Sequence, residues 1–261
     1  MIAGFRIEGP YISLEKSGAQ DIRYIHRPDA EELKDIIHRC APLMRIMTIA
    51  PELKGARTLI RVITKNKIIA SLGHSYATDR QARSGIDAGI RHATHVFNAM
   101  RGKDACGAGA AGAILADKRV FAEVILDLIH VHEALFGRLL RAKGFDKVIL
   151  ITDSVRSERR RGVRMARGAY RFKDGKLAGS ALTMIGAVKN AVERCGLSIP
   201  HAVRLATLNP ARFLGIAGTK GSIAAGKDAD IVIFDKNFDI KMTIVRGKII
   251  YQKKGFNTCA A

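Results

Sequence analysis

The sequence predicts an α/β protein with a parallel sheet, followed by a small β-rich appendix. Short β-rich runs alternate with helical patterns over most of the 261 residues, which is typical of successive strand–helix units. From Gly221 onward, apolar and polar residues alternate between turn residues, as they do in antiparallel strands. A hydrophobic content of 48% is ordinary for a globular chain and excludes a disordered or collagen-like one.

Six strands are expected in the parallel sheet. Each is a short run rich in Ile, Val and other residues that favour extended backbone. They cover residues 2–8, 45–50, 68–73, 92–97, 121–128 and 147–152.

Helices are expected between and after these strands. Residues 29–39 repeat apolar side chains on one helical face behind Asp29, and residues 78–88 begin with Thr78, so each segment starts with a good N-cap. Further helices are predicted over 182–194 and 200–208, with Asn209 and Pro210 opening the next helical turn.

The charge and the cysteine content indicate which partners and which cellular compartment to expect. Lys and Arg total 44 against 24 Asp and Glu, so the net charge of +20 suits polyanions or phosphorylated small molecules as partners. The chain starts without a leader-like apolar run, and no window approaches ~18 consecutive apolar residues. We expect a soluble, cytoplasmic protein. The cysteines lack Cys-x-x-Cys spacing, which fits a reducing compartment and excludes a cysteine zinc site: Cys40, Cys106, Cys195 and Cys259.

A basic segment over residues 156–173 admits two interpretations. Eight Lys and Arg side chains crowd this stretch directly after the sixth strand. Such runs are usually solvated loops. The alternative is a contact surface for phosphate or nucleic acid.

Four residues that can perform chemistry lie at or just beyond the carboxyl ends of candidate strands. In a parallel α/β barrel, catalytic groups converge on that face. One carboxylate and two imidazoles form a familiar ligand set for a divalent metal with an open position for water, and a second acid beside them suits a general base. Taken singly, a strand-end histidine or a turn-capping aspartate is more often structural; the combination favours a site. The four are Glu8, His74, His95 and Asp153.

Two further segments contain residues of types that are common in functional sites. His130 ends the fifth strand and can reach the same face, whereas His132 starts the next helix and is expected to cap it. Residues 107–112 match the pattern G-x-G-x-x-G but do not follow a strand, so we interpret them as a Gly/Ala loop and not as a nucleotide site.

Several motifs, in order along nearly the whole chain, resemble the N-acetylglucosamine-6-phosphate deacetylases of the amidohydrolase superfamily. They are Ile7-Glu-Gly-Pro-Tyr-Ile, Ser71-Leu-Gly-His-Ser-Tyr-Ala-Thr, His92-Ala-Thr-His-Val-Phe-Asn-Ala-Met, Ile151-Thr-Asp, Leu177-Ala-Gly-Ser-Ala-Leu-Thr-Met, Asn209-Pro-Ala-Arg and Gly221-Ser-Ile-Ala-Ala-Gly-Lys-Asp-Ala-Asp.

The resemblance implies a fold, a reaction and roles for particular residues. Residues 1–218 would form a partial TIM-like (β/α) barrel of the metal-dependent hydrolase type with about six of eight strands, and 219–261 the remnant of a small β-sandwich domain. The reaction would release acetate from N-acetylglucosamine 6-phosphate and leave glucosamine 6-phosphate. Glu8, His74 and His95 would bind one divalent metal ion, taken to be Zn²⁺, and Asp153 would be the catalytic acid and base. The residues placed around the sugar are Ala19, Asn98, Ala99, His130, Leu177, Ala178 and Gly179.

The chain also departs from the family pattern. Family members start upstream, with two more barrel strands, the first of which often carries a second-metal His-x-His pair. Leu128 follows Asp127 where Gly is common, and Cys106 stands where the family has an Arg that holds the phosphate of a neighbouring subunit's substrate. We expect the basic segment 156–173 to replace that Arg, with Arg101 and Lys103 as other candidates.

Other functions remain open. The chain could be a truncated remnant that only binds or supports a partner, or an amidohydrolase for a different N-acyl or cyclic amide. Nucleic acid is not expected as a partner, because no basic motif interleaved with aromatic residues accompanies the charge. No membrane partner is expected, and the family resemblance leaves a homodimer open.

Overall fold

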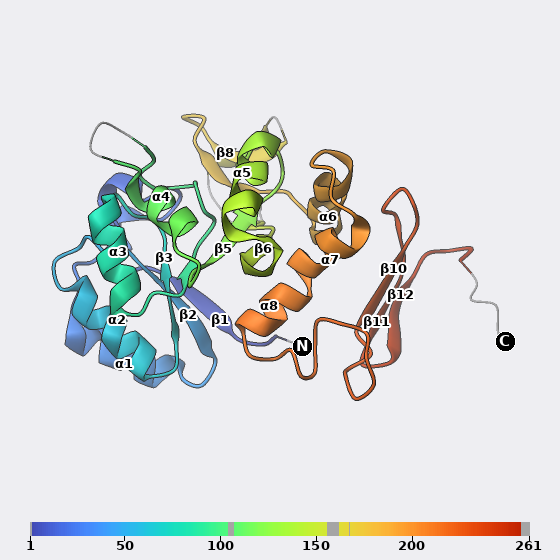
Figure 1. Cartoon of the computed structure of the whole chain (residues 1–261), viewed down its shortest axis with the longest axis horizontal. Helices are drawn as coiled ribbons and strands as arrows, with labels where there is room; N and C mark the ends of the chain where they lie inside the picture. Colours follow the sequence, from blue (N-terminus) through green and yellow to red (C-terminus); the bar gives the residue numbers. More distant parts are fainter. Residues whose placement is uncertain (1, 104–106, 156–161, 167, 257–261) are drawn as a thin grey trace.

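The computed structural model describes residues 2–103, 107–155, 162–166 and 168–256. Its main sheet has six parallel strands that pair in chain order, which is how a barrel wall is built. Helices cover its outer side, and a separate three-stranded sheet stands at one end of the molecule (Figure 1). The six strands are β1 Phe5–Glu8, β2 Met44–Ile49, β3 Ile69–Leu72, β4 His92–Ala93, β5 Phe121–Ile125 and β6 Val148–Ile151.

All six predicted strands are present, but β4 ends four residues and β5 three residues before its predicted end. Strand β4 stops at Ala93 because the next residues turn, with left-handed backbone at His95 (φ 30°), Phe97 (φ 79°) and Ala99 (φ 49°). Strand β5 stops at Ile125, ahead of Leu128 (φ 66°). The apolar residues continue beyond the ends of β4 and β5 into the turns, so the sequence pattern could not show where these strands end.

The predicted helix caps are confirmed. The Asp29 side chain accepts hydrogen bonds from the backbone of Glu31 and Glu32, and Thr78 forms a capping box with Gln81. The helices are α1 Ala30–Cys40, α2 Ala56–Lys65, α3 Asp79–Ala88, α4 Gly109–Ala116, α5 Glu133–Lys143, α6 Met184–Glu193, α7 Ile199–Ala206 and α8 Leu208–Phe213.

The interpretation of residues 107–112 as a loop was wrong, because most of them belong to α4. This helix is built largely from Gly and Ala, and Gly109, Ala110 and Ala113 are fully or nearly buried. Small side chains allow α4 to pack closely against α3, and Ala has the highest helix propensity. The absence of a preceding strand did correctly exclude a dinucleotide-binding turn.

The described part of the basic segment contains two β-strands, where a solvated loop was expected. Strands β7 Val163–Ala166 and β8 Ala169–Phe172 pair antiparallel, and β9 Leu177–Ser180 completes a second three-stranded sheet. The many charged residues made the strand pattern hard to recognise, although Gly168 and Gly175, both with positive φ, mark the turns between the strands. Residues 156–161 and 167, with five of the eight basic side chains, lie outside the described residues.

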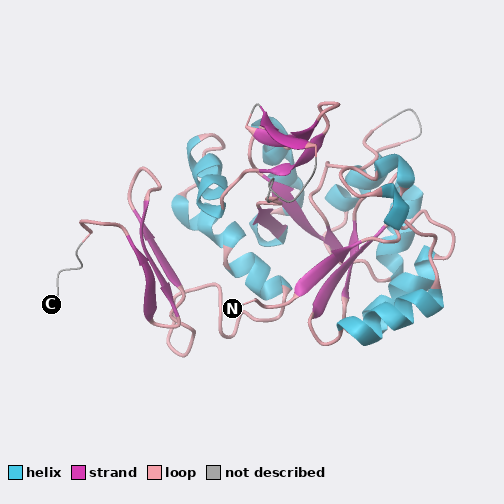
Figure 2. Ribbon diagram, turned by 180° about the vertical axis from the view of Figure 1, so that it is seen from behind, coloured by secondary structure: helices cyan, strands magenta, loops and turns pink. Residues whose placement is uncertain are grey.

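The C-terminal strands are antiparallel, as predicted. They are β10 Ile231–Phe234, β11 Ile240–Val245 and β12 Lys248–Gln252 (Figure 2). Residues 221–230, at the start of the predicted alternating stretch, belong to no strand. The domain division at 218/219 stays a prediction.

A polar layer crosses the inside of the curled sheet. Arg6 on β1 donates to Glu123 on β5 at 2.5 Å, although these strands are not neighbours. His92 on β4 lies 3.3 Å from the same carboxylate. Burial raises the pKa of Glu123, but the positive charges of His92 and Arg6 outweigh it and hold the pKa at about 2. The ion pair therefore ties one edge strand to the opposite side of the arc.

Replacing Glu123 with Gln is expected to lower the free energy of unfolding by about 3 kcal/mol, since it leaves the largely buried Arg6 charge with only a longer ion pair to Glu8 at 3.8 Å. Because the folded pKa of Glu123 is depressed, its contribution is present above the unfolded pKa of about 4.5 and is lost as pH falls toward 2. Urea unfolding between pH 7 and pH 3 measures both effects. Asp87→Asn, which removes an exposed partner of Arg119, is the control and should change stability by less than about 1 kcal/mol.

Candidate metal centre and cavity

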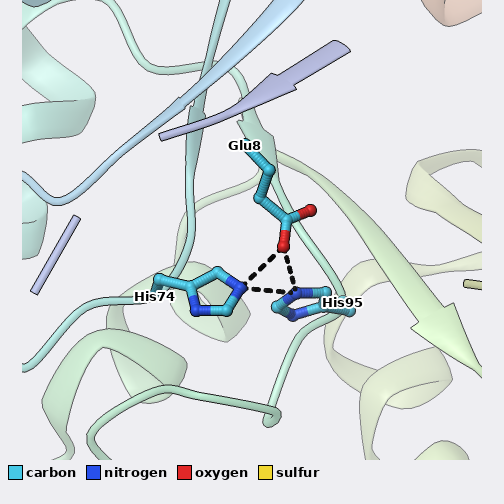
Figure 3. A group of neighbouring side chains, drawn as sticks. All are labelled: Glu8, His74 and His95. Atoms are coloured by element: carbon cyan, nitrogen blue, oxygen red, sulfur yellow. Dashed lines mark hydrogen bonds and ion pairs between the residues drawn. The ribbon is translucent and has the colours of Figure 1, made fainter. Parts of the chain in front are cut away.

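The strands deliver three predicted ligands to one point. Glu8 is the last residue of β1, and His74 and His95 each lie two residues beyond a strand end. Glu8 Oε1 lies 2.7 Å from His74 Nε2 and 3.5 Å from His95 Nε2, and the two Nε2 atoms are 3.1 Å apart (Figure 3). The parallel arrangement thus brings together residues up to 87 positions apart in the chain, counted as 95 − 8.

Three residues of the site have left-handed backbone, which sets the direction of their side chains. His74 (φ 48°), His95 (φ 30°) and Asp153 (φ 47°) all adopt conformations that non-glycine residues normally avoid. Each costs on the order of 1–3 kcal/mol and persists only where surrounding packing enforces it. Each follows the end of its strand within two residues, so the turns start directly above the barrel interior.

The electrostatics keep the carboxylate in its ligand form. Burial raises the pKa of Glu8, but hydrogen bonds with His74 and His95 outweigh burial, so the pKa lies well below its usual range. Burial lowers the pKa of His95, yet its contact with Glu8 outweighs this and raises the pKa overall. The single carboxylate charge of the cluster therefore favours a cation beside it, either a proton on an imidazole or a metal ion.

The donor set fits a metal ion. His74 Nδ1 donates to the backbone carbonyl of Lys16 at 2.7 Å, which leaves a lone pair on Nε2 of the neutral ring. That nitrogen faces a carboxylate oxygen and a second imidazole nitrogen, so a cation between them relieves the repulsion. Tetrahedral zinc with bonds of about 2.0–2.1 Å has ligand atoms roughly 3.3 Å apart. The observed spacings of 2.7–3.5 Å bracket this value.

Every residue that the sequence predicted for the site lines one cavity of about 430 Å³. Asp153 and His130 join the three ligands on its wall, and the remaining predicted residues come from the two segments that follow β1 and β4 and from β9. Their roles stay predictions. All eleven line the cavity: Glu8, Ala19, His74, His95, Asn98, Ala99, His130, Asp153, Leu177, Ala178 and Gly179.

His130 is held by an acid from its own turn. Its Nδ1 lies 2.6 Å from Asp127 Oδ2, and its backbone N–H donates to Asp127 Oδ1 at 2.7 Å. Burial raises the pKa of Asp127, but the hydrogen bonds from His130 outweigh this and lower it. His130 Nε2 is thereby left for the cavity. The neighbouring His132 caps α5, as predicted, by accepting from the backbone of Ala134.

The sequence missed the contribution of the loop that follows β1. Gln20 Nε2 donates to Glu8 Oε1 at 3.0 Å, and the Lys16 carbonyl accepts from His74. Neither residue has a telling spacing or residue type. Only the return of this loop across the carboxyl ends of β1 and β3 brings it to the ligands.

Two cations among the described residues line the cavity, Lys16 and Lys176. Arg101, expected as a possible phosphate ligand, instead stands over the Tyr76 ring at 4.9 Å, and neither it nor Lys103 belongs to the lining. Cys106, at the position of the family's phosphate-binding Arg, lies outside the described residues.

No helix in the described parts of the chain has the length and apolarity needed to span a bilayer.

Comparison with known proteins places this fold and site in a family. The model of the amidohydrolase family matches residues 1–250, and the chain belongs to that family. The N-acetylglucosamine-6-phosphate deacetylase of Lysinibacillus sphaericus is 32% identical over 260 residues, which cover 96% of this chain and 67% of that protein. The N-acetylgalactosamine-6-phosphate deacetylase of Escherichia coli O157:H7 is 33% identical, with 95% and 68% covered.

Solved structures agree. The crystal structure of N-acetyl-D-glucosamine-6-phosphate deacetylase from Mycobacterium smegmatis has a TM-score of 0.89 at 33% identity, covering 95% of this chain and 69% of that one. The enzyme of the same name from Pasteurella multocida gives 0.87 at 32% identity, covering 95% and 67%. The resemblance drawn from the motifs is thus confirmed, and the chain spans about two thirds of the length of these relatives.

The metal site can be tested by removing one ligand. His95→Ala should weaken zinc binding by roughly 100-fold or more, since loss of an outer-shell partner alone costs ~10–100-fold. Calorimetric titration of chelator-treated protein with zinc measures the effect. His132→Ala, which alters only a helix cap, should bind as the parent does; equal loss in both variants would contradict the assignment.

Proposed function

We propose that this chain hydrolyses the N-acetyl group of N-acetylglucosamine 6-phosphate, producing acetate and glucosamine 6-phosphate, with one zinc ion held by Glu8, His74 and His95. The observation that carries the proposal is the convergence of these three ligands with Asp153 and His130 in one cavity. The membership of the chain in the amidohydrolase family and the names of its relatives support the substrate class.

The proposed roles follow from the chemistry of an amide. Zinc bound at the triad would polarise the acetyl carbonyl and make water more acidic. Asp153 would take a proton from the attacking water as its oxygen bonds to the carbonyl carbon. It would return that proton to the sugar nitrogen as the carbon–nitrogen bond breaks. His130, oriented by Asp127 through Nδ1, would stabilise the developing oxyanion by donating from Nε2 when both ring nitrogens carry protons.

Asp153→Asn should therefore lower kcat by roughly 10²–10⁴-fold, because it removes general acid–base catalysis, while zinc binding persists. Acetate release from N-acetylglucosamine 6-phosphate measures this. Asp35→Asn, which breaks an exposed ion pair with Arg39 on α1, is the matched control. Zinc binding by the parent chain without acetate release would instead favour a catalytically impaired remnant.

A second candidate substrate is the galactosamine epimer, since one relative at 33% identity is named for it. Running both sugars in the same assay separates the two, and unphosphorylated N-acetylglucosamine tests a change of substrate class. The homodimer that the family resemblance allows and the cytoplasmic location remain predictions. The free thiols of Cys40 and Cys195 are compatible with a reducing compartment.

The sugar phosphate requires a cation near the cavity. Arg164 and Arg171, described members of the basic segment, lie on β7 and β8 and do not line it, whereas Lys16 and Lys176 do. Lys176 also lies 3.2 Å from Asp174 and is largely exposed, so it can exchange that partner for a phosphate at little cost. Among the described cations we therefore assign the phosphate to Lys16 and Lys176, and the five arginines of the basic segment that lie outside the described residues stay a prediction.

Lys176→Met or Lys16→Met should raise KM for the phosphorylated sugar roughly 10-fold or more, as expected for loss of a charged hydrogen bond. KM for the unphosphorylated sugar should not change. Arg164→Ala serves as control. If that control raised KM and the lysine variants did not, the phosphate would belong to the basic hairpin after all.

A further inference from the structure

We propose that Gln20 is a positioning residue for Glu8, and that the loop of residues 13–20 holds two of the three metal ligands in place before a metal binds. The proposal rests on the metal site put forward above, but it does not depend on the identity of the substrate. It concerns the atoms that fix the ligands and not the reaction itself.

The loop grips His74 from both its backbone and its ring. The backbone N–H of Ser13 donates to the His74 carbonyl at 2.9 Å, and His74 Nδ1 donates to the Lys16 carbonyl at 2.7 Å. The second bond fixes the tautomer, so Nε2 is available as a ligand. One loop therefore sets both the position and the protonation pattern of this imidazole.

Gln20 acts on the atom of Glu8 that faces the histidines. Its Nε2 donates to Glu8 Oε1 at 3.0 Å, and the same oxygen lies 2.7 Å from His74 Nε2. An ionised carboxylate oxygen has more than one lone pair, so it can accept from the amide and still bind a cation. On the other side, Arg6 Nη2 comes only within 3.8 Å of Oε2. The amide, more than the guanidinium, orients the ligand oxygen.

Glu8 needs this support because of its place in the fold. Strand β1 is an edge of the six-stranded sheet, and the Glu8 side chain is 21% exposed, against 5% for each histidine. A glutamate has three rotatable side-chain bonds, so a partly exposed one loses entropy on binding a metal unless it is already held. Gln20 covers Glu8 at the boundary between the 430 Å³ cavity and a second hollow beside β1, both of which it lines.

The loop has the backbone that this contact requires. Gly18 has a φ of +58°, and a Cβ there would lie 3.0 Å from His74 Cε1. A side chain would push the loop off the imidazole. The Gln20 backbone N–H then donates to the Ser17 carbonyl at 2.9 Å, which closes the turn that directs the Gln20 side chain at Glu8.

The test is zinc affinity without substrate, measured by calorimetric titration of the chelator-treated full chain. Gln20→Met keeps the length of the side chain but removes the donor, and should weaken zinc binding ~10–100-fold, the range for outer-shell partners. Gln20→His keeps an N–H donor and should retain affinity within about 3-fold. Gln252→Met, far along the chain on β12, is the matched control and should not change affinity.

A second variant approaches the loop independently. Gly18→Ala places a methyl group against His74 and should also weaken zinc binding by roughly 10-fold or more. Far-ultraviolet circular dichroism of each metal-free variant checks that it is folded, and the Gln20→His variant shows whether loss in Gln20→Met reflects the missing donor.

The outcomes separate the two proposals. Unchanged zinc affinity in Gln20→Met, or equal loss in Gln20→Met and Gln20→His, would overturn the positioning role and leave the metal site intact. No zinc binding by the parent chain would overturn the metal site together with this inference. If Gln20 contacts only substrate, acetate release changes while zinc affinity does not, which also overturns it.

Discussion

The ion pair between Arg6 and Glu123 is the interaction on which the geometry of the site depends. It joins β1 to β5 across the inside of the sheet, past three intervening strands. Side chains two apart on a strand share a face, so the strand that points Arg6 inward also points Glu8 inward, one step nearer the carboxyl end. Strand β1 pairs with β2 alone, so this ion pair adds a second tie between the backbone of the edge strand and the rest of the sheet.

The same polar layer supports the histidine side of the site. Ser71 lies 2.9 Å from His92 Nδ1 and 2.6 Å from the Thr94 hydroxyl, which in turn contacts Thr48 at 3.0 Å. Below them, the Phe213 ring from α8 stacks on His92 with centroids 4.3 Å apart. These buried contacts fix the ends of β3 and β4, so the left-handed turns at His74 and His95 begin from a rigid base. Their backbone cost is tolerated because the layer beneath is fully buried and hydrogen-bonded across strands.

The loops above the barrel also hold the side chains of the site in place. The strand ends place the three ligand atoms, the loop of residues 13–20 fixes their orientation, and Asp127 fixes His130 in the same way on the other side. Both supporting groups act through hydrogen bonds to a side chain that faces the cavity. In the proposed metal site, the outer hydrogen-bond partners would therefore matter as much as the ligands themselves.

Sequence alone determined the parallel sheet, the caps at Asp29 and Thr78, and the four residues at strand ends, because these follow from local patterns and from the rule that parallel strands share a carboxyl edge. It misjudged α4 and the β7–β8 hairpin, where glycine, alanine and arginine composition hid the periodicity. Tertiary structure alone decided that Arg6 reaches Glu123, that Gln20 returns to Glu8, and that Lys16 and Lys176 line the cavity. Such contacts depend on the curl of the whole sheet and on the paths of loops, and no local run of residues encodes either.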